Sequence, residues 1–485
     1  MDGKREAESE SHELKGNAIG LGRIVFFVIA AAAPLTGTLG AIPIAIGLGN
    51  GAGAPIAFVA AGLLLTLFSV GYGRMAVRVR NAGAFYAYVA RGLGQPAGIG
   101  AAAVAILSYL ALQIALYGLF GFFCGLTFDP LIGRSPGWIV YALAALVVVH
   151  LLGRRGVEVN GALLGILMIV ESAIVLVLAG TIVLSGGGPD GLTLAPFEPS
   201  RLLAPGAGIA LIFALACFVG FEATAIYAEE ARDPQRTVPR ATYLAVAAIA
   251  LFFAFVAWAI VCAHGLSAAQ GAAQADPGAF WFAISDRLLG AGYSNAMSVL
   301  LLGSTFASIL AFHNMIARYL YALGREGVLW RALGRTDPVH RSPRIAGAVQ
   351  SVGALVAILP CAVSGADPYA VVFGWGGALG TIGIIALQLL ICIAIIAFFR
   401  REPEGESPWA VLIAPALSAI GLGLILSLAL RNLSVLSGTD SPWLWALPCF
   451  QLLLFGGGML LGRRRPAYGD PNGFPIADRN TIGAA

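Results

Sequence analysis

The sequence predicts an all-α polytopic membrane protein with twelve transmembrane helices, in a 5+5 inverted repeat whose helices 1 and 6 are discontinuous. Three observations predict this fold. Hydrophobic residues make up 59% of the 485 residues and charged residues only 11%, whereas an average soluble domain is about 25% charged. Twelve apolar runs match or approach the length of about 20 helical residues that a hydrocarbon core requires. Two of these runs are interrupted at corresponding places in the two halves of the chain.

The twelve runs are joined by short polar connections. They lie at residues 22–48, 54–77, 96–127, 137–153, 160–185, 205–230, 240–264, 294–323, 344–364, 369–399, 408–431 and 441–462. All but four of the 29 Lys and Arg residues fall in loops on the side of the N-terminus. By the positive-inside rule both termini are therefore cytoplasmic. Arginine far outnumbers lysine, and alanine and glycine are abundant, which indicates a GC-rich bacterial gene and hence the cell inner membrane.

The ends and connections of the chain predict smaller elements. Residues 1–16 and 463–485 are polar, lack periodicity and predict two cytoplasmic tails. Residues 81–91 are too short to cross the bilayer and predict a helix lying at the cytoplasmic interface. In the long outer loop 265–293, Phe280–Leu289 predicts an amphipathic helix that either covers a vestibule or only connects two spans.

The composition also excludes several classes of site. The six cysteines are dispersed without a CxxC pair, so neither a disulfide framework nor a metal site is indicated, and no cofactor is expected. The net charge of +4 lies in cytoplasmic loops and indicates contact with membrane lipids rather than nucleic acid. Because no Gly-x-x-x-x-Gly-Lys-[Ser/Thr] loop occurs, ATP-driven transport is disfavoured.

The two interruptions are Ala33–Thr38 in the first run and Cys217–Glu222 in the sixth. In lipid a helix breaks only where its freed backbone groups are buried in protein or line an aqueous cavity. Discontinuous helices in corresponding halves are typical of the central site of a transporter.

The positions of the breaks divide the chain into repeats. Spans one to five (about residues 17–190) and six to ten (about 200–399) form two halves of a transporter core at 17–399. Since five is odd, the second half enters the membrane from the opposite side, which gives the inverted topology of alternating access. Spans eleven and twelve, within residues 400–462, fall outside the repeats as packing or dimerisation elements, and the oligomeric state stays open.

Four motif-like stretches follow one another along nearly the whole chain: Thr36-Gly37-Thr38 with Pro43, Ala82–Gly92, Phe218–Glu222 with Glu229–Arg240, and Arg318–Gly327 with Ser342-Pro343. In this order they resemble the amino acid-polyamine-organocation superfamily of secondary transporters. The resemblance implies transport of amino acids or related amines, with protons or by exchange. It also implies that backbone N–H groups of the first break hold a carboxylate, and that carbonyl groups of both breaks hold an amine. Here Thr36-Gly37-Thr38 exchanges the glycine and hydroxyl positions of the family's Gly-[Ser/Thr]-Gly, which leaves room for an amine without a carboxylate.

Residues at the two breaks and one on the third span are therefore expected to bind the substrate. They are Ala33, Thr36, Gly37, Thr38, Gln113, Phe218, Gly220, Phe221 and Glu222. For Phe218 and Phe221 the alternatives are a gate over the substrate and simple packing. For Gln113 they are a pocket lining and a hydrogen bond between helices.

Two acids are candidates for proton coupling. Glu171 lies near the middle of the fifth span, where a charged side chain costs about 2.5–3.5 kcal/mol on the mildest scale. It either relays protons or packs as a neutral acid. Glu222 relays a proton, responds to pH, or caps backbone donors that the second break frees. Thr305 and Ser308 in the eighth span are possible Na⁺ ligands, and His313 in the same span is either a titrating group or a core histidine.

The function predicted from the sequence is a permease that imports an amino acid or related organic amine, coupled to protons, by alternating access. The alternatives are an amine or polyamine exchanger and a Na⁺-coupled symporter. A membrane-bound acyltransferase is a more remote alternative, because His313-Asn314 stands without a cluster of other catalytic side chains.

Overall fold

The protein is described from a computed structural model, which describes residues 17–79, 83–155, 157–403 and 405–464. The predicted tails at 1–16 and 463–485 lie outside these residues, except for Arg463 and Arg464. The described residues are mainly helical and include no β-strand, with one isolated bridge between Ile19 and Ala231.

The helices of the first half follow the predicted runs. They are α2 (Leu21–Ala32), α3 (Pro34–Thr36), α4 (Ile42–Ile44), α5 (Ala54–Arg78), α6 (Phe85–Leu93), α7 (Gln95–Ile132), α8 (Trp138–Gly153) and α9 (Val157–Leu184). The π-helical segments Gly37–Ala41 and Ala45–Asn50 and the 3₁₀ turn Gly51–Gly53 continue the first run after its break.

The second half begins with α10. Its helices are α10 (Ala207–Ala216), α11 (Pro234–His264), α12 (Ala269–Ala275), α13 (Phe280–Leu289), α14 (Ala291–Arg325), α15 (Arg344–Val363), α16 (Gly374–Arg401), α17 (Ala414–Arg431), α18 (Leu433–Ser437) and α19 (Ala446–Arg464). Short 3₁₀ or π segments join them at Ala195–Phe197, Pro199–Leu203, Phe221–Ala225, Arg331–Gly334, Pro368–Phe373, Trp409–Ile413 and Pro442–Trp445.

Ten helices in the described residues are long and apolar enough to cross a membrane, against twelve runs in the sequence. The difference has two causes. The first candidate, Leu21–Arg78, is 58 residues long and contains two of the runs, and the fourth run forms the shorter helix α8. The outside of the bundle exposes large apolar side chains, among them Leu63, Leu251 and Leu452, as expected of helices that face lipid.

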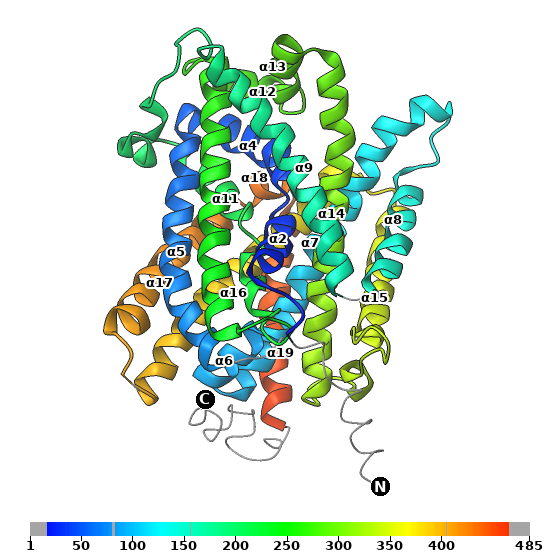
Figure 1. The fold of residues 1–485 in the computed structure, drawn as a ribbon, viewed down its shortest axis with the longest axis vertical. Helices are drawn as coiled ribbons and strands as arrows, with labels where there is room; N and C mark the ends of the chain where they lie inside the picture. The colour runs from blue at the N-terminus through cyan, green and yellow to red at the C-terminus, as the bar shows by residue number, and fades with distance from the viewer. Residues whose placement is uncertain (1–16, 80–82, 156, 404, 465–485) are drawn as a thin grey trace.

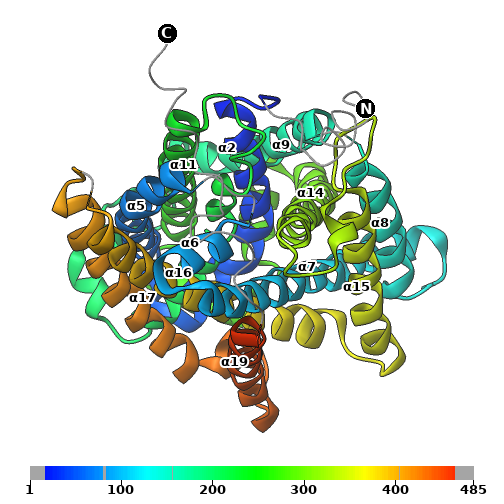
Figure 2. The ribbon, with the colours of Figure 1, turned by 90° about the horizontal axis from the view of Figure 1, so that it is seen from below.

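α2 lies inside the bundle, packed against α9, α11 and α14, whereas α17 and α19 lie at its edge (Figure 2). α12 and α13 lie at one end of the bundle and α6 at the other (Figure 1). The bounds of α13 are those that the sequence predicts.

A short helix, α6, lies at one end of the bundle (Figure 1), in the part of the chain where the sequence predicts an interfacial helix at 81–91. Residues 81 and 82 lie outside the described part of the chain, and α6 spans Phe85–Leu93, so it begins and ends later in the sequence than predicted. The aromatic side chains of α6, Phe85, Tyr86 and Tyr88, are buried inside the bundle rather than lying on a surface. A Cβ on Gly92 would overlap the backbone of Ala394 in α16, so α6 packs directly on that helix.

Candidate functional site

The first membrane helix is interrupted at Ala33. Its φ of 50° and ψ of 72° lie in the left-handed region, which costs a residue other than glycine about 1–3 kcal/mol. Pro34 follows, and a proline both lacks the N–H of a helical ladder and disfavours helical geometry in the residue before it. α2 therefore ends one residue earlier, and a new helical segment starts at Pro34.

Hydroxyl groups of α14 lie against this break. The backbone N–H and the hydroxyl of Thr36 both donate to Ser304 Oγ, at 3.3 and 3.2 Å. Thr36 Oγ1 and Thr305 Oγ1 share a hydrogen bond of 3.3 Å, and Ser308 Oγ donates to the backbone carbonyl of Ala30 at 2.9 Å. Backbone groups on both sides of the break thus have partners on α14, as buried backbone groups require.

Glu171 approaches the same break from α9. Its side chain is 1% exposed, and neither carboxyl oxygen has a hydrogen-bond partner in the described residues. The carboxyl group faces the Ser304 hydroxyl and the backbone N–H of Leu35. Most buried polar groups in native proteins have a partner, and the exceptions are often functional.

The second break follows α10. Gly220 adopts a φ of 109°, which glycine adopts at no steric cost. A Cβ at this position would lie 2.7 Å from Cβ of Ala31 in α2. Glycine is therefore required both by the backbone conformation and by the close approach of the two interrupted helices.

Glu222 is held by three hydrogen bonds. Its Oε2 accepts the backbone N–H of Gly220 at 3.1 Å, and its Oε1 accepts the hydroxyl of Tyr109 at 2.9 Å. The hydroxyl of Tyr72 donates to the backbone carbonyl of Glu222 at 2.7 Å. With a side chain 1% exposed, this acid caps a donor next to the break, which is one of the roles that the sequence left open.

The two breaks lie against each other. Gly220 packs on Ala31, and a Cβ on Gly37 would lie 3.4 Å from Sγ of Cys217 and 2.7 Å from Cζ of Phe253. Segments about 185 residues apart in the sequence therefore meet inside the bundle. Thr38 is turned back on its own segment, where its hydroxyl donates to the carbonyl of Pro34 at 2.7 Å.

Phe218 and Phe221 are both buried, at 1% and 0% exposed. The Phe221 ring meets the edge of Phe68 with ring centres 5.7 Å apart, in the edge-to-face geometry that aromatic pairs prefer. Phe218 lies under Gly62 of α5, where a Cβ would be 3.7 Å from its ring. Both side chains thus have packing partners on α5.

Gln113 forms its hydrogen bonds with α14 and α15 rather than with the two interrupted segments. Its Nε2 donates to the carbonyl of Ile309 in α14 at 3.1 Å, and its Oε1 accepts from Nε2 of Gln350 in α15. The side chain is fully buried and joins three helices, as polar residues between membrane helices commonly do. His313 is also buried, with its ring packed on the backbone of Gly153.

Sequence reasoning did not identify the partners of Glu222, the two tyrosines Tyr72 and Tyr109. A tyrosine within a membrane helix carries a hydroxyl that needs a partner when buried, so the residue type gave a signal. Nothing in the sequence showed which acid it would meet. Gln350, the partner of Gln113, was missed for the same reason.

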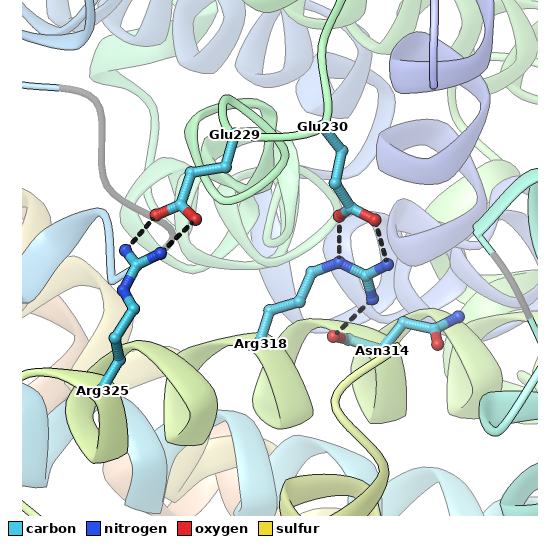
Figure 3. A network of polar contacts seen from close by, with 5 residues as sticks. All are labelled: Glu229, Glu230, Asn314, Arg318 and Arg325. Carbon is cyan, nitrogen blue, oxygen red and sulfur yellow. Dashed lines mark hydrogen bonds and ion pairs between the residues drawn. The ribbon is translucent and has the colours of Figure 1, made fainter. Parts of the chain in front are cut away.

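Glu229 and Glu230 anchor the segment after the second break to α14 (Figure 3). Glu230 binds Arg318 through two hydrogen bonds of 2.5 and 3.0 Å, with both side chains at most 3% exposed. Nη1 of Arg318 also donates to the carbonyl of Asn314 at 3.1 Å. Glu229 binds Arg325 at 2.5 and 2.8 Å, but there the arginine side chain is 33% exposed.

The backbone of this segment also holds the start of the described chain. The N–H groups of Ala18 and Ile19 donate to the carbonyl of Glu230 at 2.9 and 3.1 Å, and the N–H of Arg232 donates to the carbonyl of Ile19 at 2.8 Å. The segment 229–232 thus contacts both the residues that precede α2 and the C-terminal part of α14.

Comparison with known proteins gives one family and several relatives. The sequence model of the amino acid permease family matches residues 23–454. The low-affinity putrescine importer PlaP of Escherichia coli is 24% identical over 314 residues, which cover 63% of this chain and 66% of that protein. The branched-chain amino acid permease BcaP of Lactococcus lactis is 26% identical over 314 residues, or 59% and 64% of the two chains. BcaP of Bacillus subtilis is 24% identical over 378 residues, or 73% and 75%. The matches to the first two relatives span less than two thirds of those proteins.

Proposed function

Because the chain belongs to the amino acid permease family, we propose that it imports an amino acid or a related organic amine together with protons. The resemblance found in the sequence is thereby confirmed. The family and its relatives are permeases and not enzymes, which removes the acyltransferase alternative.

Transport proceeds by alternating access between two inverted repeats of five spans, with both termini in the cytoplasm of a bacterial cell. Two features support this topology. Counting Leu21–Arg78 as two spans and adding α8 to the other candidates gives twelve. α12 and α13 also lie at the end of the bundle opposite α6 (Figure 1), as an outer and an inner connection must.

The substrate binds where the two breaks meet, between the segments around Gly37 and Gly220. Glycines at both positions allow close packing of the two segments, and substrate sites of transporters typically lie between discontinuous helices of this kind. The names of the relatives include both a diamine and branched-chain amino acids, so the proposed class is a small amine or amino acid. Exchange of two such substrates is the alternative mode.

The single observation that carries proton coupling is the buried carboxyl group of Glu171. An ionised carboxyl group without a partner costs free energy in a membrane interior, and binding a proton removes that cost because it neutralises the charge. It faces the Ser304 hydroxyl and the Leu35 N–H beside the first break, so gain or loss of a proton acts directly on the interrupted helix. Thr305 and Ser308, the possible Na⁺ ligands on α14, lie beside the same break, where their hydroxyl groups contact Thr36 Oγ1 at 3.3 Å and the carbonyl of Ala30 at 2.9 Å, so Na⁺ is the second candidate ion.

Uptake into proteoliposomes tests both ions. Putrescine, leucine, isoleucine and valine should be assayed with an imposed pH gradient, an imposed Na⁺ gradient, or neither. We expect accumulation of at least one substrate with the pH gradient alone. Accumulation driven only by Na⁺ would overturn proton coupling, and failure with every amine and amino acid tested would overturn the substrate class.

Glu171→Gln tests the proposed coupling residue. The variant should lose accumulation driven by a pH gradient yet keep exchange of internal for external substrate, since exchange needs no net proton movement. Glu198→Gln is the control, because Glu198 is an exposed acid in the connection between α9 and α10. Unchanged proton-driven accumulation in Glu171→Gln would refute the assignment.

A further inference from the structure

A groove of about 500 Å³ lies between α5 and α11, at the end of the bundle where α6 lies. The two helices pack side by side along their length (Figure 1). They approach each other closely in the groove at Gly73, where a Cβ would lie 3.3 Å from Cβ of Pro239. Because neither residue carries a long side chain, the floor of the groove is small and apolar, and larger side chains form its rim.

Three arginines line this rim. Arg236 and Arg240 on α11 are four residues apart, and Tyr243 follows three residues later, so all three share one face of the helix. Arg74 projects into the same groove from α5. The groove thus gathers three guanidinium groups and one aromatic ring from two helices.

Acidic neighbours do not neutralise these arginines. Nε of Arg74 lies 3.5 Å from Glu406, but Glu406 also pairs with Arg78 at 3.6 Å. Arg236 lies 3.8 Å from Asp233, and both of those side chains are more than half exposed. Exposed pairs of this kind are worth little, about 0–1 kcal/mol. In the described part of the chain, Arg240 has no ion-pair partner. The groove therefore keeps an excess of positive charge.

The position of the groove indicates which anion it suits. Leu244, one residue beyond Tyr243, is 51% exposed and Leu251 is 72% exposed, so the lipid-facing apolar surface of α11 begins directly above the arginines. Basic pockets between membrane helices on the cytoplasmic side bind anionic lipid headgroups, and the end of the bundle where α6 lies is the cytoplasmic end in the topology proposed above. Guanidinium groups bind phosphate oxygens in pairs of hydrogen bonds.

We propose that this groove is a binding site for an anionic phospholipid. Arg74, Arg236 and Arg240 surround its phosphate, Tyr243 lies at the level of its glycerol, and its acyl chains run along the exposed leucines of α11. A free phosphate ion would use the arginines but would gain nothing from the apolar surface next to them. The bound lipid ties α5 to the start of α11. The site is separate from the meeting point of the two breaks, so it does not depend on the transport proposal.

Native mass spectrometry of the detergent-purified protein tests the site. The full chain should be titrated with phosphatidylglycerol, phosphatidylethanolamine or inorganic phosphate, and lipid adducts and thermal stability measured. We expect retained phosphatidylglycerol and a higher unfolding temperature with it than with the other two. Equal stabilisation by inorganic phosphate would show an anion site rather than a lipid site. Equal retention of phosphatidylethanolamine would show that negative charge is not recognised.

The triple variant Arg74→Gln/Arg236→Gln/Arg240→Gln should bind phosphatidylglycerol on the order of a hundredfold more weakly, since each arginine near an anionic headgroup contributes a factor of about five. The control Arg154→Gln/Arg155→Gln/Arg335→Gln removes three exposed arginines elsewhere and should bind normally. If the triple variant fails to fold, Arg240→Gln alone should still weaken binding severalfold. Unchanged binding in either groove variant would overturn the proposal.

Discussion

Replacing Glu230 with glutamine should destabilise the protein far more than the same change at its neighbour Glu229. Each acid binds one arginine of α14 through two hydrogen bonds (Figure 3). The pairs differ in burial: Glu230 and Arg318 are 2% and 3% exposed, whereas Glu229 and Arg325 are 16% and 33% exposed. Glu229→Gln is therefore a matched control with the same chemistry in the same segment.

The expected magnitudes follow from that difference. Removing one member of a buried ion pair costs about 3–5 kcal/mol, because the remaining charge stays buried without compensation. In Glu230→Gln, Arg318 keeps the carbonyl of Asn314 at 3.1 Å and the ring of Tyr227, whose centre is 5.0 Å away, but loses its counter-ion. For the partly exposed pair, water screens the charge, and the loss should be at most about 1 kcal/mol.

Reversible unfolding by denaturant in mixed micelles gives the free energies of unfolding for both variants. The double variant Glu230→Gln/Arg318→Met should recover part of the loss, because it removes the uncompensated charge. Equal losses for Glu229→Gln and Glu230→Gln would refute the reasoning from burial. A double variant as unstable as the sum of its two single changes would show that the two residues do not interact.

Three further outcomes can be measured directly. Gly220→Ala should lower the unfolding temperature and reduce uptake, because its φ of 109° and a contact of 2.7 Å both exclude a Cβ; normal uptake would contradict this. Tyr109→Phe removes the 2.9 Å hydrogen bond to the Glu222 carboxyl group and leaves a buried acceptor without that partner, which should cost about 1–3 kcal/mol of unfolding free energy, so an unchanged value would contradict the assigned contact. A hydrogen bond from the backbone N–H of His340 lowers the pKa of Asp337, so its stabilisation is present at neutral pH and is lost as the pH falls through the lowered folded value. Hydrogen exchange in this loop should therefore be faster in Asp337→Ala than in wild type at pH 7, with the difference shrinking in acid, and a difference that grows in acid would reverse the assigned sign.

Local features of the sequence were sufficient to place most helices. Apolar length and flanking proline or glycine located α5 and α7, and the amphipathic pattern of Phe280–Leu289 gave the bounds of α13. Ala33-Pro34 and Gly220 marked the interruptions because proline and positive-φ glycine act within one or two residues of chain. The sequence did not show that the aromatic side chains of α6 are buried against other helices, since aromatic residues suit a membrane interface and a buried packing site equally well.

What the sequence determined by itself is therefore where each helix lies along the chain, where two of them break, and that an acid such as Glu171 is placed in a membrane segment. Only the tertiary structure decided that α14 supplies the hydroxyl groups beside the first break, and that Tyr109 meets Glu222. The physical reason is that these contacts depend on how each helix is rotated about its axis and which neighbour it faces. Those choices are set by packing among all the helices at once, and no short stretch of residues encodes them.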